Sequence, residues 1–181
     1  PTVAADADAL INDPNVSVVF ILSRHDSHSE LAVKALLAGK DVFVEKPLAL
    51  NWNELELVRS AQQESGRIVW TGFNRRHSLA IRRTKAVFDR MHGPITAAYS
   101  VNAGSLPDSH WYKDRRQGGR LLGEVCHFID TLSWVIGAAP GRVQAFGDGR
   151  SEALLQENVQ LLMRYPNGST ASIAYSADGS S

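Results

Sequence analysis

The chain has 181 residues, 44% of them hydrophobic, and its 19 basic residues balance its 19 acidic residues. This length suffices for one or two small domains with buried cores, and the balanced charge gives no indication of a nucleic-acid partner. A single cysteine excludes an internal disulfide framework, and no apolar run approaches the ~20 residues that span a bilayer. We therefore expect a cytoplasmic protein that binds neither nucleic acid nor a membrane.

The first 72 residues alternate between extended and helical patterns. Residues 18–22 form a continuous apolar run, which is typical of a strand buried on both faces. A helix is expected over residues 28–38, where Gly39 ends it, and a second strand then runs into Glu45. The other expected elements are helices at 4–10 and 52–64 and a strand at 68–71. This order predicts right-handed β-α-β connections and a parallel sheet.

Lys46 stands at the carboxyl end of the second expected strand. Pro47 follows it, and proline cannot continue a strand ladder because it has no N–H group. Proline also keeps the residue before it extended. Open α/β sheets bind their ligands at the carboxyl ends of their strands, so Lys46 is a candidate site residue. The spacing alone is equally compatible with an ordinary turn and a solvated lysine.

The pattern changes between residues 71 and 78. Beyond this point we expect a long helix, a strand, an irregular segment, a second helix and three further strands. The first three regular elements are expected at 78–91, 94–104 and 122–136. Residues 156–164 and 170–175 alternate like neighbouring strands joined by a tight turn. The fold class is therefore α/β, with a parallel sheet in residues 1–72 and an α+β domain with a mostly antiparallel open sheet in residues 73–181.

The first domain resembles the nucleotide-binding domain of the Gfo/Idh/MocA oxidoreductases, the family of glucose–fructose oxidoreductase and inositol dehydrogenase. That family shows a strand, a Thr-Pro-Asn-like turn, a His a few residues on, and a Gly-Lys pair before Glu-Lys-Pro. The matching positions here are Ser23, Arg24 and His25 at the turn, then His28, Gly39, Lys40, Glu45, Lys46 and Pro47. The resemblance implies that residues 1–72 are the C-terminal half of a Rossmann-type dinucleotide-binding domain. Residues 73–181 would then bind substrate and form oligomers.

A second block carries the resemblance into the second domain. The family has a Gly-Gly pair, an Asp, a His four residues after the Asp, and another Asp three residues beyond the His. The pair stands here at 118–119, and His127 and Asp130 supply the last two positions. Gly123 occupies the first Asp position, and Glu124 follows one residue later. A shift of one residue on a helix is a rotation of ~100°, so Glu124 is only a candidate substitute for that Asp.

The resemblance implies that Lys46, His127 and Glu124 are the catalytic residues. Lys46 would stabilise a developing alkoxide, and His127 would accept the proton of the reacting hydroxyl. A lone His inside an apolar helix is otherwise a core residue. Asp130 shares a helical face with His127, so it could orient His127, bind substrate hydroxyls or face solvent.

The resemblance also implies binding roles for residues on several loops. Cofactor-binding residues would be Ser23, Arg24, His25, His28, Glu45, Lys46, Pro47, Asn74 and Arg75. Substrate-binding residues would be Lys46, Trp111, Tyr112, His127 and Asp130. Alternatives remain for some of them: His25 and His28 could cap a helix, and the two aromatic rings could hold their loop instead of stacking on a sugar. One of the arginines at 75–76 would meet a phosphate or carboxylate, and the other would be a surface charge. The spacing of His25, Asp26 and His28 matches no strong zinc pattern, so we expect no metal.

A dinucleotide-binding fold also needs a first strand followed by Gly-x-Gly-x-x-Gly, and the 181 residues contain no such turn. We therefore expect an internal fragment of a longer protein, with either NAD or NADP as cofactor. The motif variants are most similar to a branch of the family that is often fused to an alcohol-dehydrogenase-like module.

The resemblance implies an oxidoreductase that transfers a hydride between nicotinamide and a hydroxyl of a sugar, cyclitol or nucleotide sugar. Two alternatives remain open, namely a relative that uses its cofactor for glycoside cleavage or ligand sensing, and a structural module without activity of its own. The open sheet and the exposed sheet edge at 16–71 predict a homodimer or higher oligomer.

Overall fold

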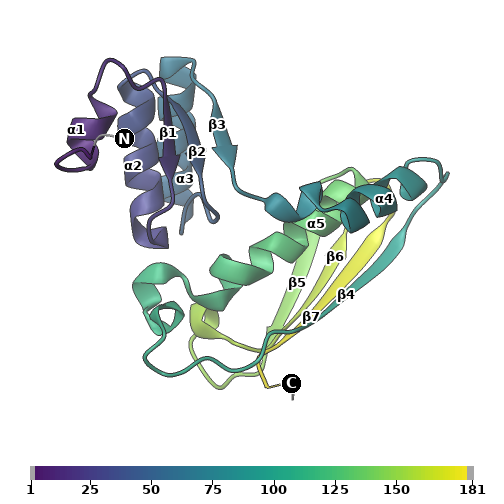
Figure 1. Ribbon diagram of the computed structural model, residues 1–181. Helices are drawn as coiled ribbons and strands as arrows, with labels where there is room; N and C mark the ends of the chain where they lie inside the picture. The colour runs from purple at the N-terminus through teal and green to yellow at the C-terminus, as the bar shows by residue number, and fades with distance from the viewer. Residues whose placement is uncertain (1–2, 179–181) are drawn as a thin grey trace. The chain divides into compact units, whose positions relative to one another are not determined.

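The computed structural model describes residues 3–178, which are drawn as ribbons in Figure 1. The chain divides into two compact units, Pro1–Gly72 and Phe73–Ser181. Each unit has its own hydrophobic core.

The first unit is a three-stranded parallel sheet with helices. Its elements are α1 (Ala7–Ile11), β1 (Val18–Ile21), α2 (His28–Leu37), β2 (Asp41–Val44), α3 (Trp52–Ser65) and β3 (Val69–Thr71). The strands lie in the order β1-β2-β3, and both neighbouring pairs are parallel, as predicted. Gly39, with a φ of 77°, follows the end of α2, in agreement with the predicted helix stop.

One face of this sheet carries the core of the unit. Val19, Ile21 and Val44 pack there against buried residues of α2 and α3, and these two helices lie side by side in Figure 1. The prediction that the first strand is buried on both faces is wrong. Phe20 is 65% exposed and Leu22 67% exposed, so the second face of this strand is largely open in the described chain. A continuous apolar run shows that both faces are apolar, but it does not show that both are covered.

The second unit combines a four-stranded sheet with two helices. Its helices are α4 (Leu79–Phe88) and α5 (Cys126–Ile136), its strands β4 (Thr96–Asn102), β5 (Arg142–Gly147), β6 (Val159–Arg164) and β7 (Thr170–Ser176). Short helical turns lie at Asn74–His77, Trp111–Lys113, Arg115–Gln117 and Ala153–Leu155, and a π-helical turn at Leu121–Val125. The strand order is β4-β7-β6-β5, with only β4 and β7 parallel, so the sheet is mostly antiparallel, as predicted.

Helix α5 covers one face of this sheet (Figure 1). Phe128 and Leu132 of α5 pack against Leu161, Ile173 and Tyr175, and all five side chains are at least 95% buried. The predicted turn between the last two strands is confirmed, since Gly168 donates to the carbonyl of Tyr165 over 3.0 Å. No helix formed by residues 3–178 is long and apolar enough to cross a membrane.

Candidate active site

Lys46 lies at the carboxyl edge of the three-stranded sheet, as predicted. The strand ladder continues one residue past β2, since the N–H of Glu45 donates to Ile21 over 2.9 Å. The Glu45 carboxylate then folds back against Gly72, where an added Cβ would lie 3.0 Å from one carboxylate oxygen. Lys46 is half-buried at this edge. A cation held at the ends of parallel strands suits an anionic or developing negative group.

His28 connects the loop after β1 with the loop after β2 at this edge of the sheet. Its Nδ1 lies 2.8 Å from the carbonyl oxygen of Pro47, and its Nε2 lies 3.1 Å from that of Ser23. The ring is 0% exposed, and His25, whose ring centroid is 5.7 Å away, is 4% exposed. Burial of both rings favours support of the Lys46 loop over the direct cofactor contact that the resemblance implies. Helix capping is not the role of His28, because its partners are carbonyl groups.

Replacing His28 by leucine tests this support. The ring N–H can donate to one of these two carbonyl oxygens, and the substitution leaves that oxygen without its donor, which costs about 1–3 kcal/mol when the group is buried. We therefore expect the free energy of unfolding to fall by about 1–3 kcal/mol in urea titrations. His92→Leu is the control, since His92 is exposed. Equal free energies of unfolding of the two variants would show that His28 does not support the Lys46 loop.

His127 stands on α5 just after the π-helical turn Leu121–Val125. A π-turn accommodates one more residue than an α-turn does, and this turn contains both Gly123, at the position of the family Asp, and Glu124. The edge of the His127 ring meets the Phe73 ring at a centroid distance of 6.2 Å. His127 is thus half-buried against the first residue of the second unit.

The Glu124 carboxylate belongs to a polar network of its own. It accepts hydrogen bonds from the Tyr175 hydroxyl and, over 3.2 Å, from Arg120. Burial and the neighbouring carboxylate raise the pKa of Tyr175 well above its usual range, so the phenol stays protonated and donates. These contacts give Glu124 a structural role. That Glu124 also takes part in catalysis stays a prediction.

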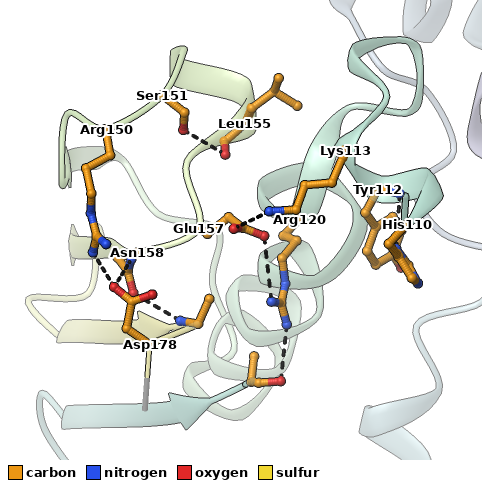
Figure 2. A network of polar contacts seen from close by, with 12 residues as sticks. His110, Tyr112, Lys113, Arg120, Arg150, Ser151, Leu155, Glu157, Asn158 and Asp178 are labelled. Carbon is orange, nitrogen blue, oxygen red and sulfur yellow. Dashed lines mark hydrogen bonds and ion pairs between the residues drawn. The ribbon is translucent and has the colours of Figure 1, made fainter. Parts of the chain in front are cut away.

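Arg120 is the centre of this network, and the sequence analysis did not single it out. Its side chain is 3% exposed and donates to the Gly104 carbonyl over 2.6 Å. Its guanidinium also lies 5.4 Å from the Tyr175 ring centroid. In Figure 2, Arg120 and Lys113 both reach Glu157, over 3.9 Å and 2.6 Å. The four-residue spacing between Arg120 and Glu124 was the available sequence signal for an ion pair.

A Glu124→Gln change separates the two roles of Glu124. It keeps the side-chain shape but removes the charge that faces buried Arg120, so we expect a loss of about 1–3 kcal/mol in unfolding free energy. Turnover of the full-length enzyme should change by less than about fivefold, since a general acid or base contributes 10²–10⁴-fold. Glu64→Gln, at an exposed glutamate of α3, is the control. A loss of turnover without a loss of stability would make Glu124 catalytic.

Asp130 is held by an arginine. Its two oxygens accept hydrogen bonds from Arg76, one of them over 2.7 Å, and its side chain is 8% exposed. Arg76 thus meets a carboxylate of the chain itself, and the solvated alternative for Asp130 is wrong. That one of the two arginines binds a phosphate or carboxylate of a ligand stays a prediction. Arg75 lies over the Phe128 ring at 4.6 Å. Both arginines fasten the turn Asn74–His77 to α5, and direct roles of Asn74, Arg75 and Asp130 toward ligands stay predictions.

The loop before the π-turn holds an aromatic cluster. The rings of Trp111 and Tyr112 lie 4.2 Å apart, and His110 stacks on Trp111 at 5.9 Å. Figure 2 shows Lys113 of the same loop bound to Glu157, which anchors the loop beside β6. Loop anchoring is thus present, while stacking of the half-buried rings on a sugar stays a prediction.

The described chain shows no group of three or more His, Cys, Asp or Glu side chains placed to hold a metal ion.

The chain is similar in fold to solved structures. A crystal structure of a probable dehydrogenase from Thermotoga maritima superposes with a TM-score of 0.84 at 25% identity, over 97% of this chain and 55% of that protein. Proteins of this fold class consist of a dinucleotide-binding unit followed by a second α/β unit.

Sequence comparison identifies the family within that class. Residues 2–73 match the oxidoreductase family with an NAD-binding Rossmann fold, and residues 82–180 match the GFO/IDH/MocA C-terminal domain. The chain therefore belongs to the Gfo/Idh/MocA family, as the sequence motifs predicted.

Named relatives act on cyclitols and sugars. A myo-inositol 2-dehydrogenase from Thermotoga maritima is 32% identical over 80% of this chain and 42% of its own length. A 1,5-anhydro-D-fructose reductase from Ensifer adhaerens is 28% identical over 89% of this chain and 50% of its own length. The chain thus spans about half the length of the relatives that it matches.

Proposed function

We propose that the chain is part of an NAD(P)-dependent oxidoreductase that moves a hydride between nicotinamide and a hydroxyl of a sugar, cyclitol or nucleotide sugar. The observation that carries the proposal is Lys46, which lies two residues after the end of β2 at the carboxyl edge of a parallel sheet. Membership of the Gfo/Idh/MocA family supports the same reaction class.

The donors at this edge fit part of a dinucleotide. The loop after β1 offers Ser23, and the loop after β2 offers Lys46, so hydroxyl and ammonium groups stand where parallel sheets bind ligands. When bound, a nicotinamide would supply the hydride acceptor. No Gly-x-Gly-x-x-Gly turn for a pyrophosphate occurs in the 181 residues.

Two residues carry the proton chemistry in this proposal. The Lys46 ammonium polarises the reacting oxygen and stabilises negative charge as the hydroxyl proton leaves. The His127 imidazole accepts that proton, because a histidine titrates near neutral pH. The ion pair between Arg76 and Asp130 fixes the helix that carries His127. The rings of Trp111 and Tyr112 stack on the sugar in this proposal.

A turnover assay of the full-length protein tests the proposal. Nicotinamide reduction is followed with myo-inositol, free sugars and nucleotide sugars, each with NAD and NADP. Turnover with one substrate, strongly reduced by His127→Asn, is the expected result. No reduction in any combination would contradict the redox reaction.

A second candidate is a cofactor-using relative that does not release an oxidised product. The observation that favours it is Gly123, which replaces the family Asp, together with the engagement of Glu124 elsewhere. Product analysis separates the two, because glycoside cleavage releases a free sugar without net cofactor reduction.

We also propose that the protein self-associates, because two apolar sheet surfaces are uncovered. Phe20 in the first unit and Phe146 in the second are 65% and 59% exposed. Light scattering measures the mass, and a monomer at all concentrations would contradict this proposal.

A further inference from the structure

The face of the four-stranded sheet opposite α5 carries two arginines at one end. Arg142 of β5 and Arg164 of β6 are directly paired across the antiparallel ladder, so both side chains leave the same face. Leu162, the next residue of β6 on this face, is 51% exposed, whereas Leu161 and Met163 point into the core. The arginine pair therefore lies on an open surface.

This pairing is unfavourable without a counter-charge. Like charges at directly opposed positions of an antiparallel pair repel each other. Among residues 3–178, neither arginine makes an ion pair or a side-chain hydrogen bond. The four strands contain no acidic residue, and Arg142 and Arg164 are their only charged residues. The described structure thus leaves the guanidinium groups of two cross-strand neighbours without a partner.

The surroundings supply further hydrogen-bond donors. A surface cavity of about 360 Å³ lies over the pair. Its lining consists of Arg142, Gln144, Leu162, Met163, Arg164, Thr170 and Ala171. Two guanidinium forks, one amide and one hydroxyl can donate into it, and no carboxylate lines it. Guanidinium groups bind phosphate and carboxylate through paired N–H donors, which lysine cannot match.

We propose that Arg142 and Arg164 form an anion-binding site that takes a phosphate or carboxylate group. A bound oxyanion offsets the repulsion between the two cations and uses their donors. The site is separate from the proposed reaction, since none of the residues assigned to catalysis lines the cavity.

Calorimetric titration of the chain with inorganic phosphate, at constant ionic strength in chloride, tests this site. The double variant Arg142→Gln/Arg164→Gln is compared with Arg82→Gln/Arg83→Gln. The control removes the same charge from two exposed arginines of α4. We expect saturable binding by the original chain and the control. In the site variant, affinity should fall about tenfold or more, as loss of one charge-assisted hydrogen bond implies. Unsaturable binding, or equal losses in both variants, would overturn the proposal.

Thermal unfolding gives a second readout. Phosphate should raise the Tm of the original chain and of the control, but not that of the site variant, because binding to the folded state stabilises it. An equal rise in the Tm of the original chain, the control and the site variant would contradict the proposed anion site.

The anion has two possible sources, which light scattering distinguishes. A mass that does not change on phosphate addition assigns the site to a free anion. Dimers that dissociate on phosphate addition, and that the site variant fails to form, assign it to a carboxylate of a second copy. Phosphate that neither binds nor alters the mass would contradict both.

Discussion

Replacing Lys46 by alanine in the full-length enzyme is expected to lower kcat by about 10²- to 10³-fold. Removal of one group that stabilises developing negative charge has this size of effect in other active sites. The KM for the nicotinamide cofactor should change much less, since the charge is needed mainly in the transition state. Steady-state kinetics with the best substrate of the turnover assay measures both constants.

Two further lysine variants make this result specific. Lys34→Ala removes a charge from the exposed side of α2, where Lys34 pairs with Asp8 and Glu30, and it should leave kcat unchanged. Lys46→Arg keeps the charge but alters its geometry, so it should recover only part of the rate. Turnover of Lys46→Ala equal to that of the original enzyme would exclude the electrostatic role.

Gly119→Ala is expected to destabilise the second unit by about 3 kcal/mol or more, because two costs add. Gly119 has a φ of +61°, which side chains rarely adopt. An added Cβ would also lie 2.3 Å from the carbonyl oxygen of Leu154, and backbone cannot move aside as a side chain can. Urea unfolding of the chain measures the loss.

Gly104→Ala separates these two costs. Gly104 has a φ of +68°, but an added Cβ would find nothing within 4 Å. Its substitution should therefore show the backbone cost alone, about 1–2 kcal/mol. Equal losses at the two positions would mean that the approach of Leu154 to Gly119 does not restrict this position.

The sequence predicted the sheets well, because their signals are local. Apolar runs indicate where the strands lie. Gly39 after α2 and the turn before β7 mark the ends of elements through their backbone conformation. Helix α4 is shorter than predicted at its end, Leu79–Phe88 instead of 78–91. Residues 89–91 are polar or exposed, so no packing extends the helix over them.

The predicted site residues were less well specified, because their contacts are distant in the chain. Asp130 meets Arg76, 54 residues earlier, and Glu124 meets Tyr175, 51 residues later. No local spacing indicates either pair. Likewise, His28 was recognised by its position in a motif, but its two carbonyl partners depend on how loops meet at the sheet edge.

The π-helical turn at Leu121–Val125 changes how Glu124 and His127 are oriented relative to each other. In a regular α-helix each residue adds a rotation of ~100°, and a π-turn, which holds more residues per turn, adds less. Glu124 lies inside this turn and His127 lies just beyond it. The three-residue separation of the two side chains therefore does not translate into the rotation about the helix axis that a regular α-helix would give.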